Sequence, residues 1–135
     1  KNIEEKCSMN ISEIFKKKGE KFFRIEEKKE VLKLLKKNNC VIALGGGAFI
    51  NGTIRNNVLK NTISMWLDVN LRTLNKRIKW SKKRPLVSRK NNQKKINELY
   101  FERKNIYKLA DHKINCDNLN KENIAKKIII FYEKH

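Results

Sequence analysis

The sequence lacks the features of membrane proteins and of metal centres built from cysteine and histidine. No apolar run approaches the length of a transmembrane helix, and the first residues carry no signal-peptide pattern. The three cysteines, Cys7, Cys40 and Cys116, are far apart and form no Cys-x-x-Cys pair, and there are only two histidines. A Cys/His metal site is therefore disfavoured, and reduced thiols in a cytoplasmic protein are the simplest interpretation. Cys40 and Cys116 are predicted to lie on strands and to face a core.

Acidic residues are also scarce. Lys and Arg number 33 against 14 Asp and Glu, which gives a formal net charge of +19. Such a field attracts nucleic acid, acidic membranes or phosphorylated metabolites. The lysines are spread along the chain, however, and no zinc-finger spacing, interleaved aromatic run or helix-turn-helix accompanies them. Biased composition is the favoured interpretation, and a basic nucleic-acid-binding domain is kept as the alternative from another functional class.

Three of the five glycines stand together in Gly45–Gly47, directly after the apolar run Val41–Leu44. An apolar run that ends in a turn signal predicts a buried strand, here Cys40–Leu44, which enters a loop. Three consecutive glycines cost backbone entropy on folding, so a plain surface turn seldom needs all of them. A loop without side chains lets backbone N–H groups approach a ligand closely. A tight strand-to-helix turn without a ligand is the alternative.

Helical and strand patterns alternate along what is predicted to be a single domain over residues 1–135. Asn10 and Glu13 have the spacing of a capping box, Gly19 is predicted to end that first helix, and Asn120 to cap the last one. Helices are predicted over residues 11–18, 20–37, 53–60, 71–79, 93–109 and 122–133, and strands over 40–44, 62–67 and 113–116. This alternation predicts an α/β fold with a parallel sheet. Three strands are few for such a sheet, so an element is expected to be missing ahead of them.

Arginine is the informative basic residue, because lysine dominates the chain and a guanidinium can clamp a carboxylate or phosphate with two hydrogen bonds. The candidate ligand-binding arginines are Arg24, Arg77, Arg84 and Arg103. Taken singly, each is better explained as a solvated surface residue, and Arg55, Arg72 and Arg89 are assigned to the surface. Glu26 and Glu27 lie within one helical turn of the first candidate and could orient it, with an ordinary helical ion pair as the alternative.

Four short motifs follow one another along the chain. They are Gly19-Glu20-Lys21-Phe22-Phe23-Arg24, Val41-Ile42-Ala43-Leu44-Gly45-Gly46-Gly47, Arg84-Pro85-Leu86, and Arg103 four residues before Tyr107. Each motif is weak alone, but the four in this order, with a long basic loop in its place, resemble the shikimate kinase family. The resemblance implies a three-layer P-loop kinase fold with a parallel sheet. It also implies transfer of the γ-phosphoryl group of ATP to the 3-hydroxyl of shikimate, in chorismate and aromatic amino-acid biosynthesis, by a cytoplasmic monomer.

The resemblance assigns substrate-binding roles to five residues. Arg24 and Arg103 match the arginines that hold the shikimate carboxylate in the family. Gly45, Gly46 and Gly47 match the loop whose backbone contacts the substrate hydroxyls, with Gly46 at its centre.

The resemblance also assigns a nucleotide side. Residues Trp80–Asn92 match the lid that closes over ATP, and the chain's only proline, Pro85, lies within it. Arg84 matches the catalytic, phosphate-contacting arginine of that lid, and Arg77 a second arginine beside the nucleotide. Such a lid arginine supplies positive charge where negative charge develops during phosphoryl transfer.

The chain departs from the family at one decisive motif. The phosphate loop Gly-x-x-x-x-Gly-Lys-Ser/Thr, whose residues hold ATP and Mg²⁺, is absent from the 135 residues. The family's Asp-x-Asp element would fall immediately ahead of Lys1. We therefore expect an N-terminally truncated fold that lacks the first strand, the P-loop, the first helix and the second strand, a unit of roughly thirty residues. The chain as given is expected not to phosphorylate shikimate. A degenerate relative without a P-loop and a gluconate-type kinase are the alternatives within the same fold.

Overall fold

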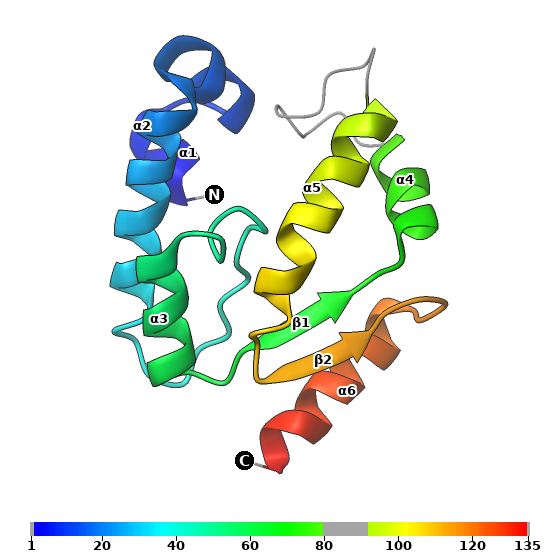
Figure 1. Ribbon diagram of the computed structural model, residues 1–135. Coiled ribbons are helices and arrows are strands. Elements are labelled where there is room, and N and C mark those ends of the chain that lie inside the picture. The colour runs from blue at the N-terminus through cyan, green and yellow to red at the C-terminus, as the bar shows by residue number, and fades with distance from the viewer. Residues whose placement is uncertain (1, 80–91, 135) are drawn as a thin grey trace. The chain divides into compact units, whose positions relative to one another are not determined.

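The computed structural model of the chain describes residues 2–79 and 92–134, which form two compact units (Figure 1). Among the described residues, the first unit comprises residues 2–61 and the second comprises residues 62–79 and 92–134. Residues 80–91 of the predicted lid lie outside the described part, and Asn92 begins a helix. The expectation of one domain with a lid stays a prediction.

The first unit is helical, with α1 (Asn2–Cys7), α2 (Ile11–Leu34) and α3 (Gly52–Asn61). The predicted capping box at the start of α2 is confirmed. The Glu13 N–H donates to Asn10 Oδ1 at 2.9 Å, and the Asn10 N–H donates to Glu13 Oε2 at 2.9 Å. The predicted interruption at Gly19 is also confirmed, since its φ of 80° and ψ of 166° kink α2. That left-handed φ favours glycine over any residue with a Cβ atom.

Apolar side chains of α2, the following loop and α3 form the core of this unit. Ile14 is fully buried, and the buried Phe23 ring lies 4.9 Å from the ring of Phe15. Further buried residues are Val31 on α2, Ala48 and Phe49 on the loop, and Ile54 and Val58 on α3. This packing fixes the loop against α2, which bears on the site described below.

Glu26 is the buried carboxylate that links α1 to α2. Glu26 is only 5% exposed. Its carboxylate accepts hydrogen bonds from Lys29 at 2.8 Å and from Lys6 of α1. These two bonds, from Lys29 and then from Lys6, lower the pKa of Glu26 from an ordinary value of 4.5 to about 2. The expectation that Glu26 orients Arg24 is therefore wrong, because its charge is satisfied by lysines.

Acid should destabilise the first unit through Glu26. Because the pKa of Glu26 in the folded chain lies below its value in the unfolded chain, its stabilising effect is complete above pH 4.5 and is lost as the pH falls toward about 2. Urea unfolding of the wild-type chain and of Glu26→Gln at pH values from 6 to 3 should show a flatter dependence in the variant. Glu102→Gln, on an exposed position, should keep the wild-type dependence; parallel curves for the wild type and Glu26→Gln would contradict the assignment.

Residues 40–44 do not form the predicted strand. Cys40 is exposed and Val41 is 95% exposed. A strand exists only through hydrogen bonds to a neighbouring strand, and within residues 2–79 and 92–134 the sheet consists of two strands that lie elsewhere. The segment is apolar as expected, but within the described residues no strand pairs with it. The prediction that Cys40 faces a core is wrong, whereas Cys116 is buried as predicted.

The second unit is an α/β layer structure around the parallel pair β1 (Met65–Asp68) and β2 (His112–Asn115). In the register, Trp66 pairs with Lys113 and Met65 with His112, so these two pairs point to opposite faces of the sheet. The Trp66 ring lies 6.1 Å from Tyr107 of α5 (Asn92–Tyr107), and the His112 ring stacks on Phe131 of α6 (Lys121–Glu133) at 4.7 Å. Helices therefore cover both faces, which gives the expected three layers (Figure 1).

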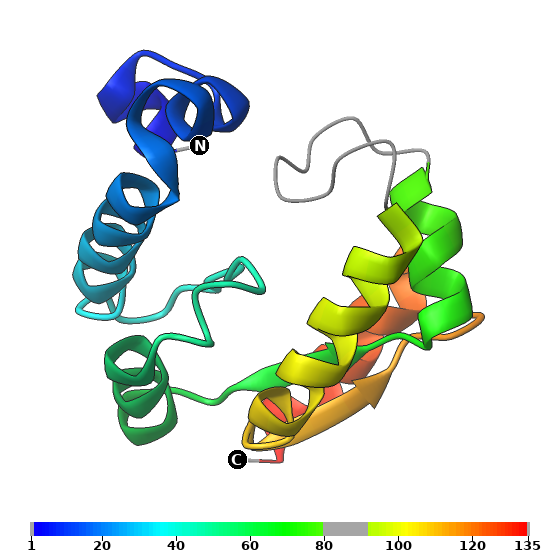
Figure 2. The same cartoon turned by 45° about the horizontal axis from the view of Figure 1, so that its top comes forward.

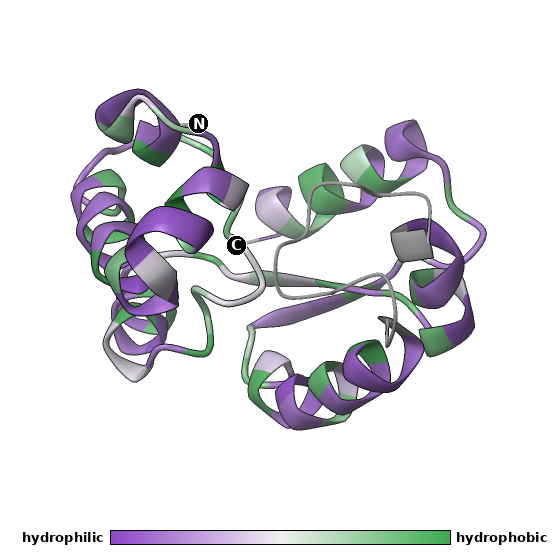
Figure 3. Ribbon diagram, turned by 90° about the horizontal axis from the view of Figure 1, so that it is seen from above, coloured by the Kyte–Doolittle hydropathy of each residue, from purple (hydrophilic) through white to green (hydrophobic). Residues whose placement is uncertain are grey.

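Local signals place the other elements of this unit where the sequence predicts them. The remaining helix is α4 (Leu71–Lys79), and its first turn is capped by Asn70 Oδ1, which accepts from the Thr73 N–H at 2.8 Å. Asn120 caps α6 in the same way, at 2.8 Å from the Asn123 nitrogen. Hydrophilic residues are spread along the helices of both units rather than gathered on one element (Figure 3), as the dispersed lysines of the sequence predict.

Candidate functional site

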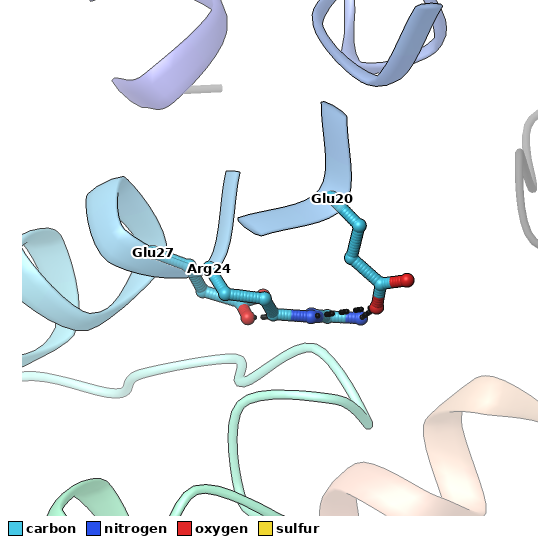
Figure 4. A network of polar contacts seen from close by, with 3 residues as sticks. All are labelled: Glu20, Arg24 and Glu27. Carbon is cyan, nitrogen blue, oxygen red and sulfur yellow. Dashed lines mark hydrogen bonds and ion pairs between the residues drawn. The ribbon is translucent and has the colours of Figure 1, made fainter. Parts of the chain in front are cut away.

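Arg24 is the centre of the candidate site in the first unit. It lies on α2 between two glutamates, one turn before it and one turn after it (Figure 4). Glu20 Oε1 accepts from Arg24 Nε at 3.2 Å and from Nη2 at 3.1 Å, and Glu27 Oε2 accepts from Nη1 at 2.6 Å. The i,i+4 and i,i+3 spacings bring these side chains together on one helix face. Of the five guanidinium N–H donors, three are used in this way.

The predicted ligand-binding glycine loop runs between α2 and α3 (Figure 2). At Gly47 it lies against the Arg24 side chain. A Cβ atom on Gly47 would lie 2.6 Å from Arg24 Nη2, 2.7 Å from Cζ, and closer still to Nη1. A Cβ atom on Gly45 would lie 3.3 Å from Glu27 Oε1. Neither Gly45 nor Gly47 has a left-handed backbone, since among the described glycines only Gly19 has a positive φ. Close approach of the guanidinium to the loop is therefore the reason for glycine at Gly47.

Hydrogen bonds fix the loop in this position. The Ala48 N–H donates to the Gly45 carbonyl at 2.9 Å, and the Asn51 N–H donates to the Ala48 carbonyl at 3.1 Å. Arg55 Nη1 donates to the carbonyls of Phe49 (3.2 Å) and Ile50 (2.9 Å). The assignment of Arg55 to the solvated surface is therefore wrong. Its place in the first turn of α3, just after the loop, is the sequence signal that could have identified this role.

Two carboxylates around one guanidinium give the site its electrostatic character. Glu27 is largely buried and makes the shorter contact, so it fixes the orientation of Arg24, as the sequence suggests. The Arg24 guanidinium carbon also lies 5.3 Å from the ring centroid of Phe23. An arginine held in place by buried neighbours beside a loop without side chains is suited to bind a carboxylate or phosphate in a defined orientation.

The other predicted site residues belong to the second unit or lie outside the described residues. Arg103 lies half-exposed on α5, and within residues 2–79 and 92–134 it makes no ion pair. Arg77 lies exposed on α4, with its charge near the Cys116 thiol. Burial raises the pKa of Cys116, and the Arg77 charge opposes that effect. Arg84 lies outside the described residues. The structure thus brings Arg24, Gly45 and Gly47 together, with Gly46 in the same loop.

The described residues do not form a Mg²⁺ site, and the sequence lacks the loop that would hold the nucleotide phosphates with it. The phosphate-loop motif is absent from the 135 residues. Among the described residues, no group of three or more His, Cys, Asp or Glu side chains is placed to hold a metal ion. Within the same residues, no helix is both long enough and apolar enough to cross a membrane.

Comparison with known proteins gives the family. The family model described as shikimate kinase matches residues 1–133 of this chain. The chain belongs to the shikimate kinase family. A shikimate kinase of Bartonella henselae is 40% identical over 127 residues, which are 94% of this chain and 60% of that protein. A shikimate kinase of Sulfurihydrogenibium is 40% identical over 129 residues, which are 96% of this chain and 76% of that protein.

Solved shikimate kinase structures share the fold of this chain. The enzyme of Acinetobacter baumannii, solved in complex with shikimate, matches with a TM-score of 0.92 and 28% identity, over 98% of this chain and 75% of that one. The enzyme of Aquifex aeolicus matches with a TM-score of 0.83 and 32% identity, over 98% of this chain and 77% of that one. The predicted α/β fold of the shikimate kinase type is confirmed, and a nucleic-acid-binding domain is not favoured.

Proposed function

We propose that this chain binds shikimate and that it carries out, as part of a shikimate kinase, the transfer of the γ-phosphoryl group of ATP to the 3-hydroxyl of shikimate. The observation that carries the proposal is the placement of Arg24 against Gly47, with Glu27 fixing the guanidinium. The likeness to a structure solved with shikimate supports it. Because the chain spans only 60% of the Bartonella henselae relative, the activity of the whole enzyme belongs to this proposal.

The proposed binding mode assigns one task to each group. Arg24 and Arg103 pair with the shikimate carboxylate, and the backbone of Gly45, Gly46 and Gly47 contacts the ring hydroxyls. Arg24 suits this task because its orientation is set before the ligand arrives, which reduces the entropy lost on binding. Arg103 suits it because no described carboxylate neutralises its charge. Holding the ring at both ends would place the 3-hydroxyl for in-line attack on a phosphoryl group.

The nucleotide side of the proposal rests on Arg77 and Arg84. We assign them to the phosphates of ATP, with Arg84 as the catalytic charge. ATP is the phosphoryl donor of the family, and Mg²⁺ would supply charge neutralisation at its phosphates. Because the 135 residues lack the phosphate-loop motif, and the described ones hold no cluster that could bind a metal ion, no reaction step is assigned to ATP or Mg²⁺. The expectation that the chain as given does not turn over shikimate stays a prediction.

Calorimetric titration with shikimate tests the binding proposal. Arg24→Ala and Arg103→Ala should each weaken binding by about 10- to 100-fold, because each removes charge-assisted hydrogen bonds to the carboxylate. Arg72→Ala is the matched control, since Arg72 is an exposed arginine of α4 to which the resemblance gives no role. Equal losses in all three variants, or none in the first two, would contradict the proposal.

The alternative of nucleic-acid binding has a different signature. Its affinity would fall steeply with salt and would depend on many dispersed lysines rather than on two arginines. A monomeric state in the cytoplasm remains part of the proposal, and light scattering of the purified chain would check the oligomeric state.

A further inference from the structure

The two glutamates beside Arg24 differ in how firmly they hold it. The Glu27 side chain is 12% exposed and accepts one bond of 2.6 Å. The Glu20 side chain is 48% exposed. Only one of its two carboxylate oxygens, Oε1, accepts from Arg24, at 3.2 Å from Nε and 3.1 Å from Nη2. A carboxylate that binds the same edge with two oxygens makes two separate bonds, usually near 2.7–2.9 Å. Glu20 therefore holds the Nε–Nη2 edge of Arg24 with one oxygen, where a carboxylate with both oxygens could make two shorter bonds.

Electrostatic repulsion favours release of Glu20 from Arg24 when a ligand carboxylate binds. Glu20, Arg24 and Glu27 carry two negative charges and one positive charge, so a third carboxylate at this point meets net repulsion. Because Glu20 is half exposed, water can solvate its carboxylate once the ion pair opens, whereas the largely buried Glu27 would have to remain.

The backbone next to Glu20 can accommodate the movement. Glu20 directly follows Gly19, whose φ of 80° and ψ of 166° interrupt the helical geometry of α2. An added Cβ atom at Gly19 would also meet nothing within 4 Å, so there is open space beside this position. Glu20, Arg24 and Glu27 all have helical backbone geometry, but only Glu20 adjoins the kink.

We propose, resting on the function proposed above, that Glu20 is a displaceable internal counter-ion of Arg24. Glu20 holds the Nε–Nη2 edge of the guanidinium until the carboxylate of the substrate takes that edge. Glu27 keeps its bond to Nη1 throughout. Glu20 is thus a positioning residue that competes with the substrate carboxylate and sets the affinity of the site for carboxylated ligands.

Calorimetric titration of Glu20→Gln with shikimate and with its uncharged methyl ester tests this role. Glutamine keeps the size and the helix propensity of glutamate but removes its charge. Shikimate should bind about two- to fivefold more tightly to Glu20→Gln, the range expected when a competing exposed ion pair is lost. The methyl ester should bind equally to both chains. Glu27→Gln should weaken shikimate binding, because Arg24 then loses its fixed partner.

Two further measurements separate the possible failures. Glu133→Gln, an exposed variant with the same change in net charge, should leave shikimate binding unchanged. Unchanged or weaker shikimate binding in Glu20→Gln, or an equal gain for the methyl ester, would overturn the role of Glu20. If Arg24→Ala leaves shikimate binding intact, the proposed function itself fails. If Arg24→Ala abolishes binding and Glu20→Gln does not tighten it, only the counter-ion proposal fails.

Discussion

Replacing Gly47 with alanine should weaken shikimate binding by about 10- to 100-fold, the equivalent of one or two lost charge-assisted hydrogen bonds. The added methyl group would lie 2.6 Å from Arg24 Nη2 and 2.7 Å from Cζ. These distances are shorter than the van der Waals separation of a methyl carbon from nitrogen or carbon, so either the guanidinium or the loop has to move. Because the guanidinium is the free end of a long side chain, it moves more easily than the loop backbone. The variant is therefore expected to lose the orientation of Arg24 while the chain stays folded.

Gly52→Ala is the matched control for Gly47→Ala. Its added methyl group would lie 3.8 Å from Arg55 Nη2, an ordinary van der Waals contact, at the first residue of α3. Alanine also favours a helix over glycine, so this variant should bind shikimate normally and unfold at the same or a higher urea concentration. Circular dichroism and urea unfolding should show Gly47→Ala to be folded. Normal shikimate binding by Gly47→Ala would show that the position of Arg24 does not matter for the ligand.

The features that the sequence predicts correctly are those with local causes. Capping by Asn10 and Asn120 depends on contacts within three residues. The kink at Gly19 depends on the backbone conformation of that one residue. The placement of Glu27 beside Arg24 follows from the pitch of one helix. The association of Arg24 with the glycine loop came from the motifs of a family, because no local rule brings residues so far apart in the chain together.

The features that the sequence does not predict depend at least in part on groups outside the element that carries them. Residues 40–44 have the composition of a strand, but a strand forms only with a neighbour. Arg55 has the composition of a surface residue, but the carbonyls of Phe49 and Ile50 bind it. Glu26 is in the same turn as Arg24, yet Lys6 of α1 helps to satisfy its charge. For Arg55 and Glu26, a group outside the helix takes part, the loop before α3 and Lys6 of α1, although Lys29 of the same helix also binds Glu26. Packing, rather than a rule within one helix, brings these outside groups into contact.

Asp111 and Ser64 form the contact whose loss should cost the second unit most. They lie 47 residues apart and join the segments that lead into β1 and β2. Asp111 Oδ2 accepts from the Ser64 N–H at 2.8 Å and from the Ser64 hydroxyl at 2.6 Å, while the Asp111 N–H donates to Ser64 Oγ at 3.0 Å. Ser64 is 7% exposed, so water cannot readily replace these bonds. The contact sets the register in which the two parallel strands begin.

Asp111→Ala should therefore lower the free energy of unfolding by about 2–4 kcal/mol, because two buried donors of Ser64 lose their acceptor. Glu102→Ala, an exposed acidic position on α5, should change it little. Ser64→Ala combined with Asp111→Ala should cost less than the sum of the two single variants, since each single variant already breaks the bond between the two side chains. Additive losses in this double-mutant cycle would show that the two side chains do not act as a pair.

The same contact predicts a direction of pH dependence. Partial burial acts to raise the pKa of Asp111, but the bonds from Ser64 and from the Asp111 N–H outweigh it and hold the pKa below its ordinary value of 3.8. The stabilisation is therefore complete above pH 3.8 and is lost as the pH falls below that value. The difference in unfolding free energy between the wild type and Asp111→Ala should accordingly shrink in acid. A difference that stays constant from neutral pH into acid would show that packing, rather than the ionised carboxylate, holds the two strands in register.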